Sequence, residues 1–399
     1  MLKGKKIALY VTGGIAIYKV VDLMRTLIKA GAEVQVAMTE SATEFVSPLT
    51  FQILSKKTVH TDTFTENDPE QVNHIHFADW PDVAIVAPLT ANTLAKLANG
   101  IADNFVSSAL LATTCPIFTI PAMNHNMYEN QATQANIETL RGRQVYIMHP
   151  DEGFLAEGYS GKGRFPTQER IIDELSAFIR ESVAELPLRG KTVLVTAGGT
   201  KERIDPVRFI SNDSSGKMGH AVAKAAWESG ADVTLITASS LSVSDNINVV
   251  QVESANEMHE AVSSRFDTSD VLVMAAAVSD YTPETTRKQK MKKQDQLTMT
   301  FKKNPDILKE MGKRKQSFQC LVGFAAETEN IEEYAKKKLE EKNADLIVAN
   351  DVGKKDRGFN VDKNEVTFFS HNQEPQNIQL KEKTEIAEDI VDWISKFIN

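Results

Sequence analysis

Apolar and polar residues in 4–39 follow the order strand, glycine turn, helix and second strand. In the middle of this segment, apolar side chains recur at helical spacing: Val20, Val21, Met24, Leu27 and Ile28. Gly31 marks the end of the predicted helix, and a new apolar run follows it. The segment therefore predicts the first βαβ unit of a parallel α/β domain.

The second half of the chain opens in the same way. Residues 190–200 form an apolar run that ends in paired glycines, 218–230 have a helical pattern, and 231–238 form the next apolar run. Pro187 and Gly190 interrupt the pattern between the halves. We therefore expect two domains, residues 1–186 and residues 187–399.

Six further segments are nearly continuous apolar runs, as expected for strands that helices cover on both faces. These segments are 83–89, 117–123, 144–150, 271–280, 320–327 and 345–351. Together with the two opening units they predict an α/β fold. It should contain two Rossmann-like, three-layer domains with mainly parallel sheets.

Composition adds constraints on partners and location. The chain has 399 residues, which favours two cores over one, and its net charge of −9 argues against a nucleic-acid partner. No apolar segment is long enough to cross a membrane, and the first residues predict a strand rather than a signal peptide. The two cysteines, Cys115 and Cys320, cannot form a disulfide framework, so we expect a cytoplasmic setting.

Gly13 and Gly14 stand between the first strand and the first helix, where backbone N–H groups can approach a phosphate or a flavin. The dinucleotide fingerprint is incomplete because its third glycine is missing. Met38 and Thr39 also end the second strand, where a ribose-binding acid is expected. The pattern favours a mononucleotide over NAD, and a simple close-packed turn explains it equally well.

Other polar segments follow predicted strands in the first half, at 87–93, 99–112 and 121–128. Their hydroxyl and amide groups suit a polar ring or a phosphate at the carboxyl edge of a sheet. His74 and His76 lie just before a strand, in an expected loop. A loop histidine is more often structural or merely exposed than catalytic.

The second half contains a glycine- and serine-rich connection, residues 196–223. Ser214, Ser215 and Gly216 can offer hydroxyl and N–H groups to a phosphate, and Lys217 adds positive charge. The spacing is not that of a Walker A motif. We therefore expect a nucleotide site without a P-loop.

The motifs "NHI" (73–75), "APLTANT" (87–93) and "PAMNHNMY" (121–128) resemble those of flavin-dependent cysteine decarboxylases. Residues 153–164 are similar to the flap with which that family recognises its substrate. The second half, with "SNDSSGKMG" (211–219), resembles phosphopantothenate–cysteine ligases. The resemblance covers essentially the whole chain and is to bifunctional enzymes of coenzyme A biosynthesis.

For the first half, the resemblance implies an FMN cofactor, with His74 as the catalytic histidine and Asn124 holding the substrate amide or carboxylate. Positions that match the family's FMN contacts are Gly13, Gly14, Ile15, Thr39, Ser41, Thr90, Ala91, Asn92 and Ser107. The implied reaction is oxidation of the cysteine CH2–S unit, loss of CO2, and re-reduction to 4′-phosphopantetheine. Oxidation supplies an electron sink that an aliphatic acid lacks, and a histidine near neutral pKa can assist proton movement.

The flap departs from the family pattern at Glu157. The coenzyme A branch commonly has a cysteine here, which donates a proton during re-reduction. A glutamic acid beneath a closed, dry flap could have a raised pKa and donate instead. Equally, Glu157 could be solvated while water or another group supplies the proton. Cys115 is expected to be a small buried residue rather than a substitute donor.

For the second half, the resemblance implies a CTP-dependent ligase. CTP activates 4′-phosphopantothenate as an acyl-cytidylate, and the amine of L-cysteine then displaces CMP. The implied CTP contacts are Met274, Ala275, Ala276, Asp280, Lys290, Asn304, Pro305, Asp306, Ile307, Phe324, Lys338 and Lys342.

Five of the implied ligase positions have roles that suit their side chains. Asn212 would stabilise the acyl-nucleotide, and Lys290, in the charged stretch 282–296, would neutralise phosphate charge. Asp280 would hold the ribose or Mg²⁺, which is expected as the partner of the triphosphate. Lys342 shares a helix face with Lys338, which suits a phosphate, although an exposed charged helix is the simpler explanation for most lysines in 336–343.

The expected partners are therefore small molecules, with neither nucleic acid nor a membrane. The resemblance also implies a homo-oligomer, with trimeric flavin domains and dimeric ligase domains. One alternative is an active ligase whose flavin half is regulatory or stops at the enethiol, because Glu157 replaces the flap cysteine. Another is a tandem-Rossmann NAD(P) oxidoreductase, which the missing glycine and acid disfavour.

Overall fold

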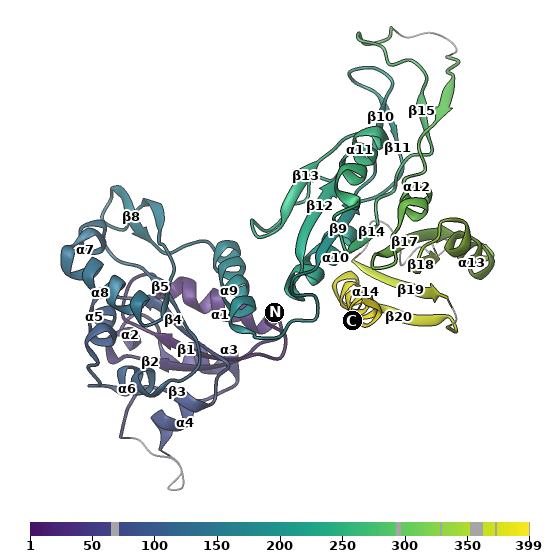
Figure 1. Ribbon diagram of the computed structural model, residues 1–399. Coiled ribbons are helices and arrows are strands. Elements are labelled where there is room, and N and C mark those ends of the chain that lie inside the picture. Colours follow the sequence, from purple (N-terminus) through teal and green to yellow (C-terminus); the bar gives the residue numbers. More distant parts are fainter. Residues whose placement is uncertain (65–71, 293–296, 328, 352–361, 372, 399) are drawn as a thin grey trace. The chain divides into compact units, whose positions relative to one another are not determined.

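The computed structural model divides the chain into two compact units, Met1–Ala184 and Glu185–Asn399 (Figure 1). The structure describes residues 1–64, 72–292, 297–327, 329–351, 362–371 and 373–398. The last residues of the charged stretch 282–296 thus lie outside the described part of the chain. Each unit has its own sheet and its own buried core.

The first unit is built on a parallel sheet of six strands in the order β3-β2-β1-β4-β5-β6. The strands are β1 (Lys6–Val11), β2 (Glu33–Met38), β3 (Val59–His60), β4 (Val83–Leu89), β5 (Ile117–Pro121) and β6 (Tyr146–Ile147). The chain order reverses between β1 and β4. Such a switch point is where open α/β sheets bind ligands, beyond the carboxyl ends of the strands.

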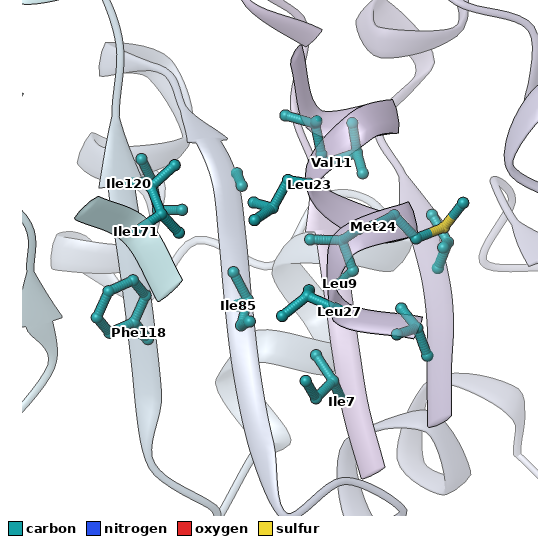
Figure 2. Packing of buried hydrophobic residues seen from close by; sticks show 14 of the residues in the cluster. Ile7, Leu9, Val11, Leu23, Met24, Leu27, Ile85, Phe118, Ile120 and Ile171 are labelled. Carbon is teal, nitrogen blue, oxygen red and sulfur yellow. The ribbon is translucent and has the colours of Figure 1, made fainter. Parts of the chain in front are cut away.

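Helices cover both faces of this sheet, which explains the continuous apolar strands. The helices are α1 (Ile17–Lys29), α2 (Glu40–Thr43), α3 (Pro48–Ser55), α4 (Asn73–Asp79), α5 (Ala91–Asn99), α6 (Phe105–Ala112), α7 (His125–Glu129), α8 (Gln131–Gly142) and α9 (Gln168–Ser182). Figure 2 shows Leu23 and Leu27 of α1 beside Leu9 of β1 and Ile85 of β4. Tyr10, on the opposite face of β1, belongs to a second core with Phe105 of α6.

Two predictions for the first unit need correction. The strand expected over 144–150 is only Tyr146–Ile147, and the chain then enters a hairpin of β7 (Asp151–Phe154) and β8 (Ser160–Arg164). The flap is thus a pair of antiparallel strands. His74 and His76 lie on helix α4, not in a loop, because Phe77 and Ala78 bury one side of that helix.

The second unit is built on an eight-stranded sheet in the order β13-β12-β9-β14-β17-β18-β19-β20. Its strands are β9 (Thr192–Ala197), β12 (Asp232–Thr237), β13 (Asn248–Gln251), β14 (Val271–Met274), β17 (Cys320–Glu327), β18 (Leu346–Asp351), β19 (Lys363–Ser370) and β20 (Gln376–Glu382). The last two strands are antiparallel and the others are parallel. The mainly parallel, Rossmann-like prediction is therefore confirmed, and the switch point lies between β9 and β14.

Among the residues described for this unit, five helices pack on the sheet: α10 (Lys217–Glu228), α11 (Ala255–Phe266), α12 (Ile307–Arg314), α13 (Ile331–Glu341) and α14 (Lys383–Ile398). The connection 196–223 is not simply a loop, because it contains a hairpin of β10 (Lys201–Arg203) and β11 (Phe209–Ser211). A second small hairpin, β15 (Tyr281–Pro283) with β16 (Phe301–Lys303), lies beside β10. The strand expected over 271–280 ends at Met274, so the segment from residue 275 to residue 280 lies after the strand, where it can form a site.

Candidate active sites

A cavity of about 830 Å³ opens at the switch point of the first sheet. Its walls come from the segments that follow β1, β2, β4 and β5, together with the β7–β8 hairpin. Most residues predicted for the flavin site and the flap line it: Gly13, Gly14, Ile15, Thr39, Ser41, Thr90, Ala91, Asn92, Asn124 and Glu157. The tertiary structure thus brings five distant segments together around one space.

The floor of the cavity is a close contact between Gly13 and Ser41. A Cβ atom at residue 13 would lie 2.5 Å from the Cβ atom of Ser41, so only glycine fits this approach. Nearby, the Thr90 N–H donates to the Thr12 hydroxyl over 3.2 Å, which joins the turns after β1 and β4. The backbone around Gly13 is therefore held as a cradle.

Thr39 leaves a polar group unsatisfied in this cradle. Its side-chain oxygen is buried and has no hydrogen-bond partner in the described part of the chain. A buried hydroxyl without a partner costs about 1–3 kcal/mol. A polar ligand in the cavity could remove this cost, so the residues present fit a mononucleotide such as FMN.

Asn124 joins the tip of the hairpin to the segment after β5. Its side-chain Nδ2 donates to Glu157 Oε1 over 3.0 Å and to the Tyr159 hydroxyl over 2.6 Å. Its Oδ1 accepts from the Asn126 N–H over 2.9 Å, which caps helix α7. The hairpin therefore covers one side of the cavity, but Glu157 itself stays exposed to solvent. Of the two environments considered for Glu157, a dry one beneath the flap and a solvated one, the structure shows the solvated one.

His74 and Ser107 stand apart from the other predicted residues. Among the residues that the structure describes, the cavity lining includes neither of them. The His74 ring packs edge-on against Phe105, and its buried Nδ1 has no partner in the described residues. The Ser107 hydroxyl accepts hydrogen bonds from the Asp103 and Asn104 N–H groups, so it caps helix α6.

In the second unit, predicted nucleotide residues gather after β14. The Ala276 N–H donates to the Thr196 hydroxyl over 3.2 Å, and Asn212 Nδ2 donates to the Val278 carbonyl over 3.0 Å. Asn304, which is buried, donates from Nδ2 to the Ser279 carbonyl over 2.8 Å. These bonds fix the backbone between Met274 and Asp280 at the carboxyl end of β14.

The predicted acid and lysines form a second group around α12 and α13. Asp306 caps α12 and forms an ion pair with Lys342, while Lys338 Nζ donates to the Phe324 carbonyl over 2.8 Å. Burial acts to raise the pKa of Asp306, but hydrogen bonds from Lys342 and the Lys309 N–H outweigh it and lower the pKa. Lys338 and Lys342 thus both have protein partners.

Lys290 is exposed, and its neighbour Met291 is held firmly. The buried Asp205 carboxylate accepts from the Met291 N–H over 3.2 Å and from the Val207 and Arg208 N–H groups over 2.8 Å. Arg208 donates to the Met291 carbonyl over 3.3 Å. The sequence prediction missed this clamp, although an acid and an arginine in a turn, "DPVR", were a visible signal.

Comparison with known proteins agrees with this division of the chain. The family model described as "Flavoprotein" matches residues 1–180. The model described as "DNA/pantothenate metabolism flavoprotein C-terminal domain" matches residues 188–398. Each match covers one of the two sheets and the residues around its switch point.

Similarity to characterised relatives extends over nearly the whole chain. The "Coenzyme A biosynthesis bifunctional protein CoaBC" of Bacillus subtilis (strain 168) is 48% identical over 398 residues, which cover 99% of this chain and 98% of the relative. The chain belongs to the family of bifunctional coenzyme A biosynthesis proteins.

Two further similar proteins carry the CoaBC name. The CoaBC protein of Haemophilus influenzae (strain ATCC 51907 / DSM 11121 / KW20 / Rd) is 43% identical over 395 residues, 98% of each chain. A crystal structure of the C-terminal domain of a CoaBC protein is 41% identical, with a TM-score of 0.47, and covers 54% of this chain and 98% of its own.

Cys115 is not placed to act in the cavity of the first unit. It is half-buried at the edge of a core, where burial raises the pKa of its thiol to about 11, and it does not line the cavity.

Two further features concern metal sites and membrane-spanning helices in the described chain. No cluster of three or more His, Cys, Asp or Glu side chains suited to a metal occurs within the described residues. None of the helices described here combines the length and apolarity needed to span a bilayer.

Gly163 offers a test of how the hairpin is docked in this family member. Its φ is 127°, and a Cβ atom there would lie 2.0 Å from the Met123 carbonyl oxygen. We expect Gly163→Ala to detach the hairpin from Met123, to expose it to limited proteolysis, and to reduce CO2 release by about 10-fold or more. CTP-dependent ligation should stay unchanged.

The matched control for Gly163→Ala is Gly100→Ala. Gly100 has a φ of 69° but no atom within 4 Å of the added Cβ, so this variant introduces backbone strain without a collision. If protease cleaves the hairpin equally slowly in Gly163→Ala and in Gly100→Ala, Gly163 does not dock the hairpin.

Proposed function

We infer that the chain is a bifunctional enzyme that makes 4′-phosphopantetheine from 4′-phosphopantothenate and L-cysteine. Residues 187–399 act as phosphopantothenate–cysteine ligase, and residues 1–186 act as phosphopantothenoylcysteine decarboxylase. The observation that carries this proposal is whole-length similarity to CoaBC proteins, combined with a cavity that joins the Gly13 cradle to Asn124. The alternative of a regulatory flavin half is not favoured.

FMN is the proposed cofactor of the first unit. The Gly13 cradle and the unsatisfied Thr39 hydroxyl fit its polar groups, and Thr90 and Asn92 at the start of α5 add further donors. When bound, FMN supplies the two-electron oxidation and re-reduction that make loss of CO2 possible. The protein supplies orientation and proton transfer.

Asn124 is the residue proposed to orient the substrate. Its amide can donate to the carboxylate or amide of the cysteinyl group once the hydrogen bonds to Glu157 and Tyr159 open. Glu157 at the hairpin tip is then free to face the bound molecule. We propose that it holds the proton needed for re-reduction.

Glu157→Gln tests that role directly. We expect wild-type protein to release the saturated aminothiol, whereas the variant, whose amide cannot supply the proton, should accumulate the enethiol or products derived from it. Mass spectrometry of the products distinguishes the two by two hydrogen atoms. Glu152→Gln, on the exposed part of the same hairpin, is the control. Identical aminothiol from wild type and Glu157→Gln would eliminate Glu157 as the donor.

His74 is proposed to act across subunits. The cavity of one chain contains the cradle and Asn124, whereas His74 lies on α4 outside the lining. A flavin site formed between neighbouring chains of a trimer would bring His74 of one chain to the cavity of the next. Dimeric ligase units would complete the homo-oligomer.

In the second unit, the proposed CTP site consists of the fixed backbone after β14, the start of α12, and the end of α13. Backbone groups at Ala275 and Ala276 can read the pyrimidine edge, while Asn212 can hold the acyl-cytidylate. Lys338 and Lys342 can turn from their present partners to phosphate oxygens. Asp280 is exposed and can bind Mg²⁺ as a single protein ligand beside the phosphates.

A reconstitution with purified protein tests the whole proposal. With 4′-phosphopantothenate, L-cysteine, CTP and Mg²⁺, it should release pyrophosphate, CMP and CO2 and form 4′-phosphopantetheine. Removal of L-cysteine should stop CO2 release. A protein that consumes no CTP, or whose isolated cofactor is not FMN, would contradict the proposal.

A further inference from the structure

Two basic side chains from distant parts of the chain line the wall of the flavin cavity. Lys19 lies in the first half of α1, and Arg164 ends strand β8 of the hairpin. Lys19 Nζ donates to the carbonyl of Phe165, the residue after Arg164, over 3.2 Å and lies 5.9 Å from the Phe165 ring centroid. This contact anchors the lysine beside the base of the hairpin.

The positive charges of Lys19 and Arg164 are poorly compensated. Burial lowers the pKa of Lys19, Arg164 lowers it further, and Asp151 acts in the opposite direction. Asp151 already forms an ion pair with Arg170. The Arg164 guanidinium has no ion pair or hydrogen bond within the described residues. Two neighbouring cations without a dedicated acid favour an anionic ligand.

The other charged side chains that line the cavity neither neutralise Lys19 and Arg164 nor add to their positive charge. Lys96 is paired with Asp103 over 2.7 Å, and Glu157 accepts from Asn124. Glu40 opens helix α2, beside the Gly13 cradle rather than on α1 or the hairpin. The excess positive charge therefore lies at the base of the hairpin.

Gly153 makes room for the Arg164 side chain. A Cβ atom at residue 153 would lie 2.9 Å from Arg164 Nη1 and 3.4 Å from Arg164 Cδ. The Arg164 side chain thus passes beside the backbone of strand β7 at Gly153. Because Nη1 is the far end of a flexible side chain, a Cβ atom at residue 153 would displace the guanidinium rather than the strand.

We propose that Lys19 and Arg164 bind the phosphomonoester of a molecule held in this cavity. The inference rests on the proposed function, because the substrate and the cofactor of that reaction each carry one phosphomonoester. The hairpin that supplies Arg164 also supplies Glu157, on the side where the substrate is proposed to bind. The 4′-phosphate of phosphopantothenoylcysteine is therefore the favoured occupant, and the 5′-phosphate of FMN is the other source.

Lys19→Met and Arg164→Met in the full-length protein test this site. Loss of one charged hydrogen bond should raise the KM for phosphopantothenoylcysteine about 10-fold to 100-fold. The KM for pantothenoylcysteine, which lacks the phosphate, should not change. The affinity for FMN, measured by quenching of flavin fluorescence, should also stay at the wild-type value. Lys19→Arg should recover most of the loss.

Binding without turnover gives a second readout. Titration of 4′-phosphopantothenate against the FMN-loaded protein, followed by the flavin absorbance difference, should show the same 10-fold to 100-fold weakening, roughly. Lys29→Met on α1 and Lys162→Met on β8 remove equal charge from the same elements outside the cavity lining, and should behave as wild type. Wild-type affinity for riboflavin shows that the flavin unit of a variant is folded.

Comparison of the affinities for FMN and riboflavin identifies which molecule's phosphate the site binds. If the affinity for FMN falls while that for riboflavin does not, and both substrates respond equally, the site holds the flavin phosphate. If the variants do not discriminate between phosphorylated and unphosphorylated forms of either molecule, the phosphate site is wrong. Failure of wild-type protein to decarboxylate phosphopantothenoylcysteine would instead contradict the proposed function, while the titrations would still decide the site.

Discussion

His74→Asn is expected to reduce CO2 release from phosphopantothenoylcysteine by about 100-fold or more, with CTP-dependent ligation unchanged. Asparagine retains a polar side chain of similar reach but cannot take up and release a proton near neutral pH. The buried His74 Nδ1 has no partner among the described residues, so the substitution breaks no hydrogen bond that is present there. Separate assays of CO2 release and pyrophosphate release measure the two activities.

His76→Asn is the matched control, because His76 lies on the same helix and is exposed. It should release CO2 at the wild-type rate. Equal loss of both activities in His74→Asn would contradict the division into two independent sites.

Co-expression of His74→Asn with Asn124→Ala tests whether the flavin site spans two chains. Each variant alone should be inactive in decarboxylation. If His74 and Asn124 act from different subunits, about one quarter of the sites in randomly mixed oligomers should contain both native residues. If both residues serve one cavity within a chain, mixing should restore no activity.

Lys290→Gln should reduce CTP-dependent pyrophosphate release by about 100-fold or more, because removal of one preorganised charge from a phosphate-transfer site has effects of this size. Lys290 is exposed, while the Asp205–Arg208 clamp holds the backbone of Met291 beside it. Glutamine should therefore leave this backbone in place and remove only the charge. Pyrophosphate release and CO2 release from added phosphopantothenoylcysteine are measured in parallel.

Lys288→Gln provides the control for Lys290→Gln. Lys288 lies in the same charged segment and is also exposed, but it has no proposed role. It should retain pyrophosphate release, which would separate the role of Lys290 from the general charge of the segment. Wild-type pyrophosphate release from Lys290→Gln would remove Lys290 from the ligase mechanism.

Local sequence pattern was sufficient for the central strands. The run 83–89 is apolar along its whole length, and the run 345–351 is apolar from residue 346 to residue 349, because helices cover both faces of the sheet. These runs form β4 and β18. In contrast, β19 shows alternating burial, with Val366 and Phe368 buried. The sequence of this segment alternates apolar and polar residues, which is typical of a strand, but no strand was predicted here.

Other elements depend on contacts that no local pattern reports. The β7–β8 hairpin contains Gly153, Gly161 and Gly163, which weaken an isolated strand. It forms here against the segment after β5, where Met123 donates to the Gly163 carbonyl over 3.0 Å. Helix α4 was mistaken for a loop because its polar face dominates the sequence while the burial of Phe77 is a tertiary effect.

The sequence by itself determined the two α/β units, the glycine turn at Gly13, and the order of motifs that marks the family, because apolar periodicity and turn residues act locally. Tertiary structure alone decided that Glu157 contacts Asn124, that His74 lies outside the cavity of its own chain, and that Lys19 meets the base of the hairpin. These contacts join residues separated by 33 to 146 positions. Such contacts depend on which strand ends and loops the folded sheet brings together. The pattern of apolar and polar residues along the chain does not report which distant residues become neighbours in space.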